Sequence, residues 1–289
     1  YLTVPSRGVD MERELYINGD LPFAGAGALT FSRLWTDAGP VRQDNQGNDI
    51  RPSQTERFEP QTAWFRDDMG YQTEPYAFYF EEGENTLTLR AVNEPVIVQG
   101  ITLTPVISYP AYAAYAQAQP DTAMTDAGKN LSLTLQGESA SLRSAPSLYA
   151  RYDRSSSLTE PYSITKTTLN YIGGDPWTHP GEWIQWDFEV PEDGYYNISI
   201  KARQMYQRGA LSARSIYLDG VIPFAEMEAV AFDYSSGWQM KTLGGEDGAY
   251  RFLNVADGLE DCILPLDDFF AAHCRRGYVR ALLWTRPAG

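Results

Sequence analysis

Apolar and polar residues alternate along several short stretches of the chain, and each stretch ends near Gly, Pro, Asn or Asp. In the stretch 183–190 every second residue is apolar, and the residues between them are polar apart from Trp183. The apolar positions are Ile184, Trp186, Phe188 and Val190. This period of two predicts a strand with one core face, which includes Trp186, and one solvent face.

A segment near the start of the chain recurs near its end, since residues 13–24 match residues 214–225 at a constant offset of 201. Each copy contains a strand pattern, an Asn-Gly or Asp-Gly pair and a second arm ending in Pro-Phe, which predicts a β-hairpin. The offset is far longer than a solenoid repeat, so we expect two homologous domains. Short strands, frequent turns and few helical stretches predict that both are antiparallel β-sandwiches in an all-β chain.

The repeat divides the chain into four parts. Residues 1–105 form a first β-sandwich that is incomplete at its N-terminus, because counterparts of residues 129–195 do not precede its hairpin. We expect either a truncated chain or another segment that completes this sandwich, since missing strands leave open edges. Residues 106–128 are a connector whose Ala-rich, Pro-flanked centre predicts a short helix, with Tyr112 and Tyr115 packed on a domain. The second β-sandwich spans residues 129–257.

The end of the chain departs from the repeat. Residues 76–89 predict two alternating strands around a Glu-Glu-Gly turn, and residues 250–252 begin in the same way before the pattern decays. Residues 258–289 therefore form an atypical tail, either a replaced final strand or a shifted reading frame, and we place no functional motif in it. Its Cys262 and Cys274 would pair in a secreted protein or remain free.

Composition excludes several classes of function. The chain has 38 acidic and 23 basic residues, a net charge of −15 and only two His and two Cys. This charge disfavours nucleic acid and anionic membrane surfaces, and no apolar stretch is long enough for direct membrane insertion. We expect no enzyme, because the nucleophile-elbow, zinc-protease and phosphate-loop motifs are missing and no carboxylate pair stands out. The 13% of aromatic residues suits the stacking of sugar rings.

Several segments resemble the galactose-binding-like β-sandwich of many carbohydrate-binding modules. They are 181–186, 190–196 and 217–220. Further segments are similar to the tandem sandwiches that precede the solute-binding domain in large extracellular lipoproteins of bacterial carbohydrate ABC importers. These are 43–52, 74–80, 153–156, 170–174 and 236–240. The likeness covers roughly residues 1–255, without the two-lobed solute-binding domain.

This resemblance implies two galactose-binding-like, jelly-roll β-sandwich domains in tandem, joined by the helical connector. It implies a non-catalytic, carbohydrate-binding accessory region at the cell surface, extracellular, with a glycan or oligosaccharide as ligand. The solute-binding domain and ABC permease of the same system would be its protein partners. Two alternatives stay open: a structural spacer or protein-interaction module, and a glycan-binding appendage of a polysaccharide-degrading enzyme.

The candidate sugar-binding residues are aromatic or cationic residues in predicted loops, where binding residues concentrate. They are Trp177, Tyr206, Arg208, Trp238 and Trp183. Trp177 lies in a Gly/Pro-rich loop and either stacks a sugar or folds down over the sandwich as a core plug. Trp183 either stacks a sugar or packs against the connector or first domain, and we favour packing.

No cofactor is expected, apart from a structural calcium ion that the resemblance suggests. Residues 44–49 are rich in Asp, Asn and Gly but lack EF-hand spacing, so we predict a turn there. Glu138 is similar to an early Glu that supports structural calcium in some related modules. That assignment rests on the resemblance alone.

Overall fold

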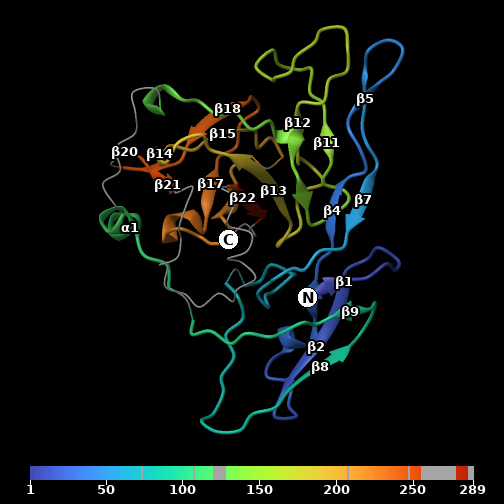
Figure 1. Ribbon diagram of the computed structural model, residues 1–289, viewed down its shortest axis with the longest axis vertical. Coiled ribbons are helices and arrows are strands. Elements are labelled where there is room, and N and C mark those ends of the chain that lie inside the picture. Colours follow the sequence, from blue (N-terminus) through green and yellow to red (C-terminus); the bar gives the residue numbers. More distant parts are fainter. Residues whose placement is uncertain are drawn as a thin grey trace.

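The computed structural model describes residues 1–72, 74–106, 108–119, 128–206, 208–246, 248–254 and 278–285. These residues form small antiparallel sheets with few helices, which confirms the all-β prediction (Figure 1). Within them, no helix combines the length and apolar character needed to cross a membrane. Cys262 and Cys274 lie outside the described residues, so whether they pair or remain free stays open.

The first copy of the repeat builds a three-stranded sheet in the order β3-β2-β8. Its strands are β2 (Met11–Ile17), β3 (Leu29–Phe31) and β8 (Leu87–Ala91). Burial alternates along β2, and its inward residues Met11 and Leu15 lie in a core with Ala26, Leu29 and Phe31. Beside it, β1 (Leu2–Thr3) pairs with β9 (Val96–Ile97), and β5 (Arg42–Gln43) pairs with β6 (Asp49–Ile50).

A seven-stranded sheet contains strands from both copies, in the order β17-β16-β22-β13-β10-β4-β7. Its strands are β17 (Val230–Phe232), β16 (Ser212–Leu218), β22 (Tyr278–Thr285), β13 (Trp183–Glu189), β10 (Leu142–Arg143), β4 (Leu34–Asp37) and β7 (Gln54–Arg57). The two parts join where Arg143 of β10 pairs with Trp35 of β4. The fully buried guanidinium of Arg143 donates to Asp37 Oδ1 at 2.8 Å, so an ion pair reinforces this junction.

The other strands form two-stranded sheets around the second copy. These are β11 (Ala150–Arg151) with β12 (Tyr171–Ile172), β14 (Gly194–Tyr196) with β21 (Phe252–Asn254), β15 (Ser199–Ala202) with β18 (Gln239–Thr242), and β19 (Gly244–Gly245) with β20 (Gly248–Ala249). The helices are α1 (Tyr112–Ala118) and the 3-10 turns η1 (Ala24–Gly27), η2 (Gly128–Asn130), η3 (Gly137–Ser139) and η4 (Ala225–Met227).

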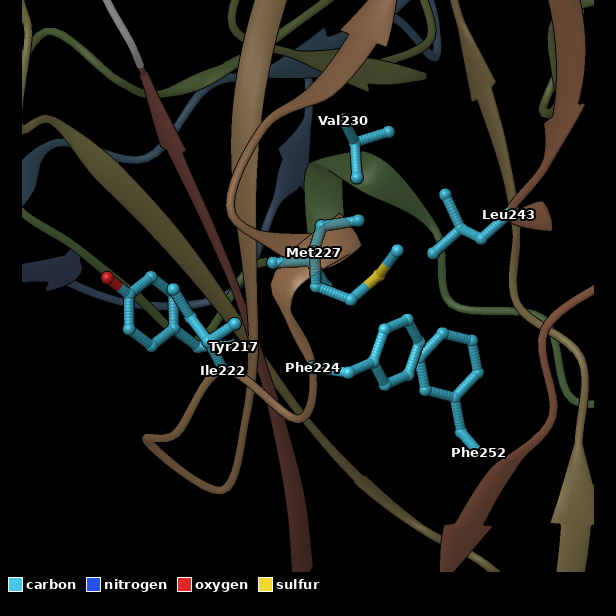
Figure 2. Close-up of a cluster of buried hydrophobic side chains, with 8 residues drawn as sticks. Tyr217, Ile222, Phe224, Met227, Val230, Leu243 and Phe252 are labelled. Atoms are coloured by element: carbon cyan, nitrogen blue, oxygen red, sulfur yellow. The ribbon is translucent and has the colours of Figure 1, made fainter. Parts of the chain in front are cut away.

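The sequence repeat is also a repeat of structure. Strand β2 pairs with β3 in the same register, shifted by the sequence offset, as β16 pairs with β17: Met11 faces Phe31, and Ser212 faces Phe232. The aromatic rings behind these hairpins repeat as well. Phe23 lies 5.4 Å from Phe78 in a stacked pair, and Phe224 lies 5.5 Å from Phe252 in the same geometry. Figure 2 shows Phe224 and Phe252 side by side in the second core.

The hairpin prediction is correct for the turn and wrong for its second arm. Asn18 and Gly19 both have positive φ, as do Asp219 and Gly220, which is the geometry of a type I′ turn. After a single bridge each chain leaves the ladder and enters a 3-10 turn. A proline in each arm, at 22 and 223, has no N–H to continue the pairing. Strands β3 and β17 take the place of the expected arms.

Two other strand predictions need correction. In residues 76–89 only β8 is a strand, and the Tyr76 and Phe78 rings instead pack on the first core. In β13 the supposed solvent face is buried at Gln185, whose amide donates to Asp187 Oδ1 at 2.7 Å. Asp187 and Glu189 on the same face are exposed, as predicted. Trp186 is half-buried and packs against the small core of Ala140, Leu148 and Ile184.

The connector helix forms as predicted, as α1. The rings of Tyr112 and Tyr115 each lie 5.0 Å from Phe224, so both pack on the core of the second copy. The carboxylate of Glu226 accepts a hydrogen bond from the Tyr112 backbone N–H at 2.9 Å, which satisfies a free donor at the start of the helix. The connector is therefore anchored on the second copy.

Candidate functional site

Trp238, the residue before β18, lies in a cluster of aromatic and charged side chains. The ring of Tyr171 on β12 packs edge-on against it, with centroids 5.8 Å apart. The Arg203 guanidinium lies over the ring, 5.0 Å from its centroid. The Trp238 indole N–H donates to Asp153 Oδ2 at 2.8 Å. Because neighbours cover its ring and its polar atom is bonded, Trp238 organises the cluster more than it offers a free surface.

Asp153 links Trp238 and Arg203 of this cluster through its carboxylate. Its carboxylate also accepts a hydrogen bond from the Ser155 backbone N–H at 2.7 Å and lies 3.0 Å from Arg203. Desolvation raises the pKa of Asp153, but the hydrogen bonds from Ser155 and Trp238 and the charge of Arg203 outweigh it, so the pKa lies below its ordinary value. The carboxylate is therefore charged at neutral pH.

Three side chains converge over Gly174 in the loop after β12. A Cβ at this position would lie 3.3 Å from the Tyr206 hydroxyl oxygen and 3.7 Å from both Arg151 and Tyr171. Gly174 also has a φ of +85°, which side-chain-bearing residues rarely adopt. Arg151 forms an ion pair with Asp175. The Gly174 backbone therefore lies beside Tyr206, which is 59% exposed, with the polar groups of Arg151 and Asp175 nearby.

Trp177 packs against the neighbouring glycine, Gly173. A Cβ at Gly173 would come within 2.8 Å of its ring. The Trp177 indole N–H donates to the Glu182 carbonyl at 3.2 Å, and the Arg214 guanidinium lies 4.5 Å from the ring centroid. The half-buried ring also packs on the small core beneath it. The Trp177 ring is therefore folded down over the sandwich, which is one of the two arrangements considered for it above.

The two other candidates occupy separate positions. Trp183 is half-buried in β13, where its backbone N–H donates to Ser144 Oγ at 2.9 Å and its strand pairs with β22. Arg208 lies over the ring of Tyr234, with 5.4 Å between the guanidinium carbon and the ring centroid. The structure therefore places Tyr206 and Tyr171 beside the same glycine, Gly174, and packs Trp238 on Tyr171. It holds Trp183 in the central sheet.

Several residues of this cluster were not predicted from the sequence. They are Tyr171, Arg203, Asp153, Arg151 and Asp175. Two of the segments that resemble importer lipoproteins, 153–156 and 170–174, contain part of this set, and β11–β12 pairing brings them side by side. The likeness marked the segments, but only the fold shows that they face Trp238.

The predicted turn at residues 44–49 is confirmed. Asp44 accepts hydrogen bonds from the backbone N–H groups of Gln46 and Asn48, each at 2.8 Å, so its carboxylate closes the loop. Asp49 then accepts a hydrogen bond from the Leu169 N–H at 2.9 Å, which ties the loop to the segment before β12.

Glu138, the residue suggested for structural calcium, has a partly buried carboxyl group. Burial, and then the nearby charge of Asp49, raise the pKa of Glu138, and its Oε2 is buried without a hydrogen-bond partner among the described residues. In the part of the chain that the structure describes, no group of three or more His, Cys, Asp and Glu side chains is placed to hold a metal ion. The calcium assignment stays a prediction.

No model of a protein family matches this sequence, and no curated protein matches it either.

Proposed function

We propose that this chain is a non-catalytic, glycan-binding module whose ligand lies on Tyr206 beside Gly174. The observation that carries the proposal is the convergence of Tyr206, Tyr171 and Arg151 over a glycine with no side chain. Sugar rings stack their C–H faces on exposed aromatic rings and hydrogen-bond their hydroxyls to neighbouring charged or amide groups. Tyr206 supplies an exposed ring, and Arg151 and Asp175 supply the hydrogen-bonding groups.

The charges favour a neutral glycan. Arg151 is paired with Asp175, and Arg203 with Asp153, so neither guanidinium is reserved for a carboxylate or sulfate on the ligand. The net charge of −15 adds a long-range repulsion for acidic sugars. In this proposal Trp177 packs beside Gly173 and Trp238 packs on Tyr171, and neither is the stacking platform. Arg208 and Trp183 lie at separate positions and take no part.

A glycan array followed by calorimetry tests the proposal. We expect binding of at least one neutral plant or host oligosaccharide, weakened about five- to tenfold by Tyr206→Ala, because one stacked ring contributes about 1 to 1.5 kcal/mol. The matched control is Tyr79→Ala, since Tyr79 is 82% exposed on the first copy. The absence of binding heat with every polysaccharide tested, or an equal loss of affinity in both variants, contradicts the proposal.

The wider setting follows from the sequence resemblance. We place the chain in tandem galactose-binding-like sandwiches of an extracellular solute-binding lipoprotein, acting with a solute-binding domain and an ABC permease. In that setting it positions glycan near the importer and catalyses no reaction. Hydrolysis of glycosides by the purified chain would contradict this part. The same site would serve an appendage of a polysaccharide-degrading enzyme.

A structural or protein-interaction module is the second candidate, and one observation favours it. The seven-stranded sheet runs through both copies, and the buried Arg143–Asp37 pair locks them together. Such a rigid unit suits a spacer between larger domains. The absence of any glycan binding, with the fold intact, would favour this candidate.

A further inference from the structure

The outer edge of β8 has a counterpart in the second copy that is occupied by a strand. Strand β8 pairs with β2 in the same register as β22 pairs with β16: Leu15 faces Leu89, and Ile216, its equivalent, faces Leu283. On its other side, residues 278–284 of β22 pair with the whole of β13. The second copy thus shows which kind of strand this edge of the repeat accepts.

In the first copy, the same edge has no strand partner among the described residues. The sheet ends at β8, which lies at the margin of this part in Figure 1. The Asn18 N–H donates to the Thr86 carbonyl at 2.9 Å, and the Val92 N–H to the Glu12 carbonyl at 3.1 Å. Antiparallel pairing alternates, so even-numbered residues of β8 bond to β2. The N–H and C=O groups of Leu87, Leu89 and Ala91 therefore point to the open edge.

We propose that the β8 edge binds an antiparallel strand from outside these 289 residues, with the residue pattern of β13. In the second copy, Ile184 lies opposite Leu283 and Trp186 opposite Ala281. By the repeat, the incoming strand places apolar side chains opposite Leu89 and Leu87, a polar one opposite Thr88, and the counterpart of Trp183 opposite Arg90. This is strand addition to a sheet edge, in which main-chain hydrogen bonds hold the strand and alternate side chains select it.

The core of the first copy explains why the incoming strand must be apolar on one face. Leu87 and Leu89 are half-buried and pack on the core around Leu15. Residues directly opposite each other in an antiparallel pair lie on the same face of the sheet. Apolar side chains opposite Leu87 and Leu89 therefore extend that core. In the second copy the equivalent Ile184 is fully buried.

A fluorescent peptide with the sequence of residues 181–191 tests the proposal on the intact chain. The Ser144 N–H donates to the Trp183 carbonyl, so odd-numbered residues of β13 face β10 and even-numbered ones face β22. N-methylation at Ile184 and Trp186 removes the two N–H groups that would face β8. We expect saturable binding that falls about tenfold or more with this change.

The matched control is the same peptide methylated at Gln185 and Asp187, whose N–H groups point away from β8. We expect it to bind within about threefold of the unmodified peptide. A photo-crosslinker in the peptide should attach to residues 87–91. No saturable binding, equal loss in both methylated peptides, or crosslinks to β7 or β3 would overturn the proposal. A dimer of the chain crosslinked through β8 of both copies would assign the edge to a second copy instead, and would also overturn it.

Discussion

At the residue scale, the candidate site depends on a backbone position that lacks a side chain. Gly174 combines a left-handed φ with close contacts to Tyr206, Arg151 and Tyr171. A side chain there would crowd the Tyr206 hydroxyl and meet Arg151 and Tyr171 at ordinary contact distance. The absence of a side chain at Gly174 therefore allows the exposed Tyr206 ring to lie close to its polar neighbours.

Gly174→Ala should lower both stability and glycan binding. The left-handed backbone costs a non-glycine residue about 1 to 2 kcal/mol, and the new methyl group crowds the Tyr206 hydroxyl. Gly181→Ala is the matched control, because Gly181 has a φ of +81° but open space around it. We expect similar losses of unfolding free energy in urea and a loss of binding only in the Gly174 variant. Equal binding by the two variants would remove Gly174 from the site.

Asp153 should make stability fall in acid. Its folded-state pKa lies below the value of about 3.9 in an unfolded chain, so its contribution is complete above that value and is lost as pH falls through the folded pKa. Asp153→Asn should destabilise the fold by on the order of 1 to 2 kcal/mol at pH 7, and the difference from wild type should shrink towards pH 3. Urea unfolding across this pH range measures both. The exposed Asp175→Asn variant should shift stability by under about 0.5 kcal/mol. A pH-independent difference for Asp153→Asn would contradict this account.

At the element scale, local signals were predictable from the sequence and long-range ones were not. The positive φ of Asn18-Gly19 follows from residue type, so the turn could be predicted. The pairing of β2 with β3 involves a proline in the arm and a 3-10 turn between the strands, which no period of two reveals. Tyr171 and Trp238 meet only because β11–β12 and β15–β18 fold together.

The junction between β10 and β4 should depend strongly on Arg143. Its guanidinium is fully buried and donates to Asp37, to Gln54 Oε1 at 2.6 Å and to the Ala140 carbonyl at 2.9 Å. Arg143→Met leaves these acceptors unpaired and should cost about 3 to 5 kcal/mol in the free energy of unfolding. Arg57→Met, which removes an exposed pair with Glu59, should cost under about 1 kcal/mol. Equal losses of unfolding free energy for the two variants in denaturant titrations would show that the junction does not depend on Arg143.

At the scale of the whole molecule, one sheet runs through both copies of the repeat. The sequence predicted the repeat and the all-β class, because both rest on patterns that a single chain carries. It did not predict that β4 and β7 of the first copy would extend the sheet of the second, since that contact depends on the three-dimensional position of Arg143 and Trp35.

The acidic surface should make glycan binding insensitive to salt. A neutral ligand gains nothing from the net charge of −15, so its affinity should change by less than about twofold between roughly 50 and 500 mM NaCl. An acidic glycan of similar size should bind only weakly, and its binding should improve as salt screens the repulsion. Calorimetric titrations at several salt concentrations measure both. Tight, salt-weakened binding of an acidic glycan would contradict the charge argument.

The central claim is that Tyr206 and Tyr171 form the sugar-binding surface, and tyrosine-selective labelling with NMR tests it most directly. Titration with a neutral oligosaccharide that binds on the array should shift the ring signals of Tyr206 and Tyr171 in proportion to saturation. The signal of Tyr79, exposed on the first copy, should not move. Binding that leaves Tyr206 and Tyr171 unchanged would contradict the account.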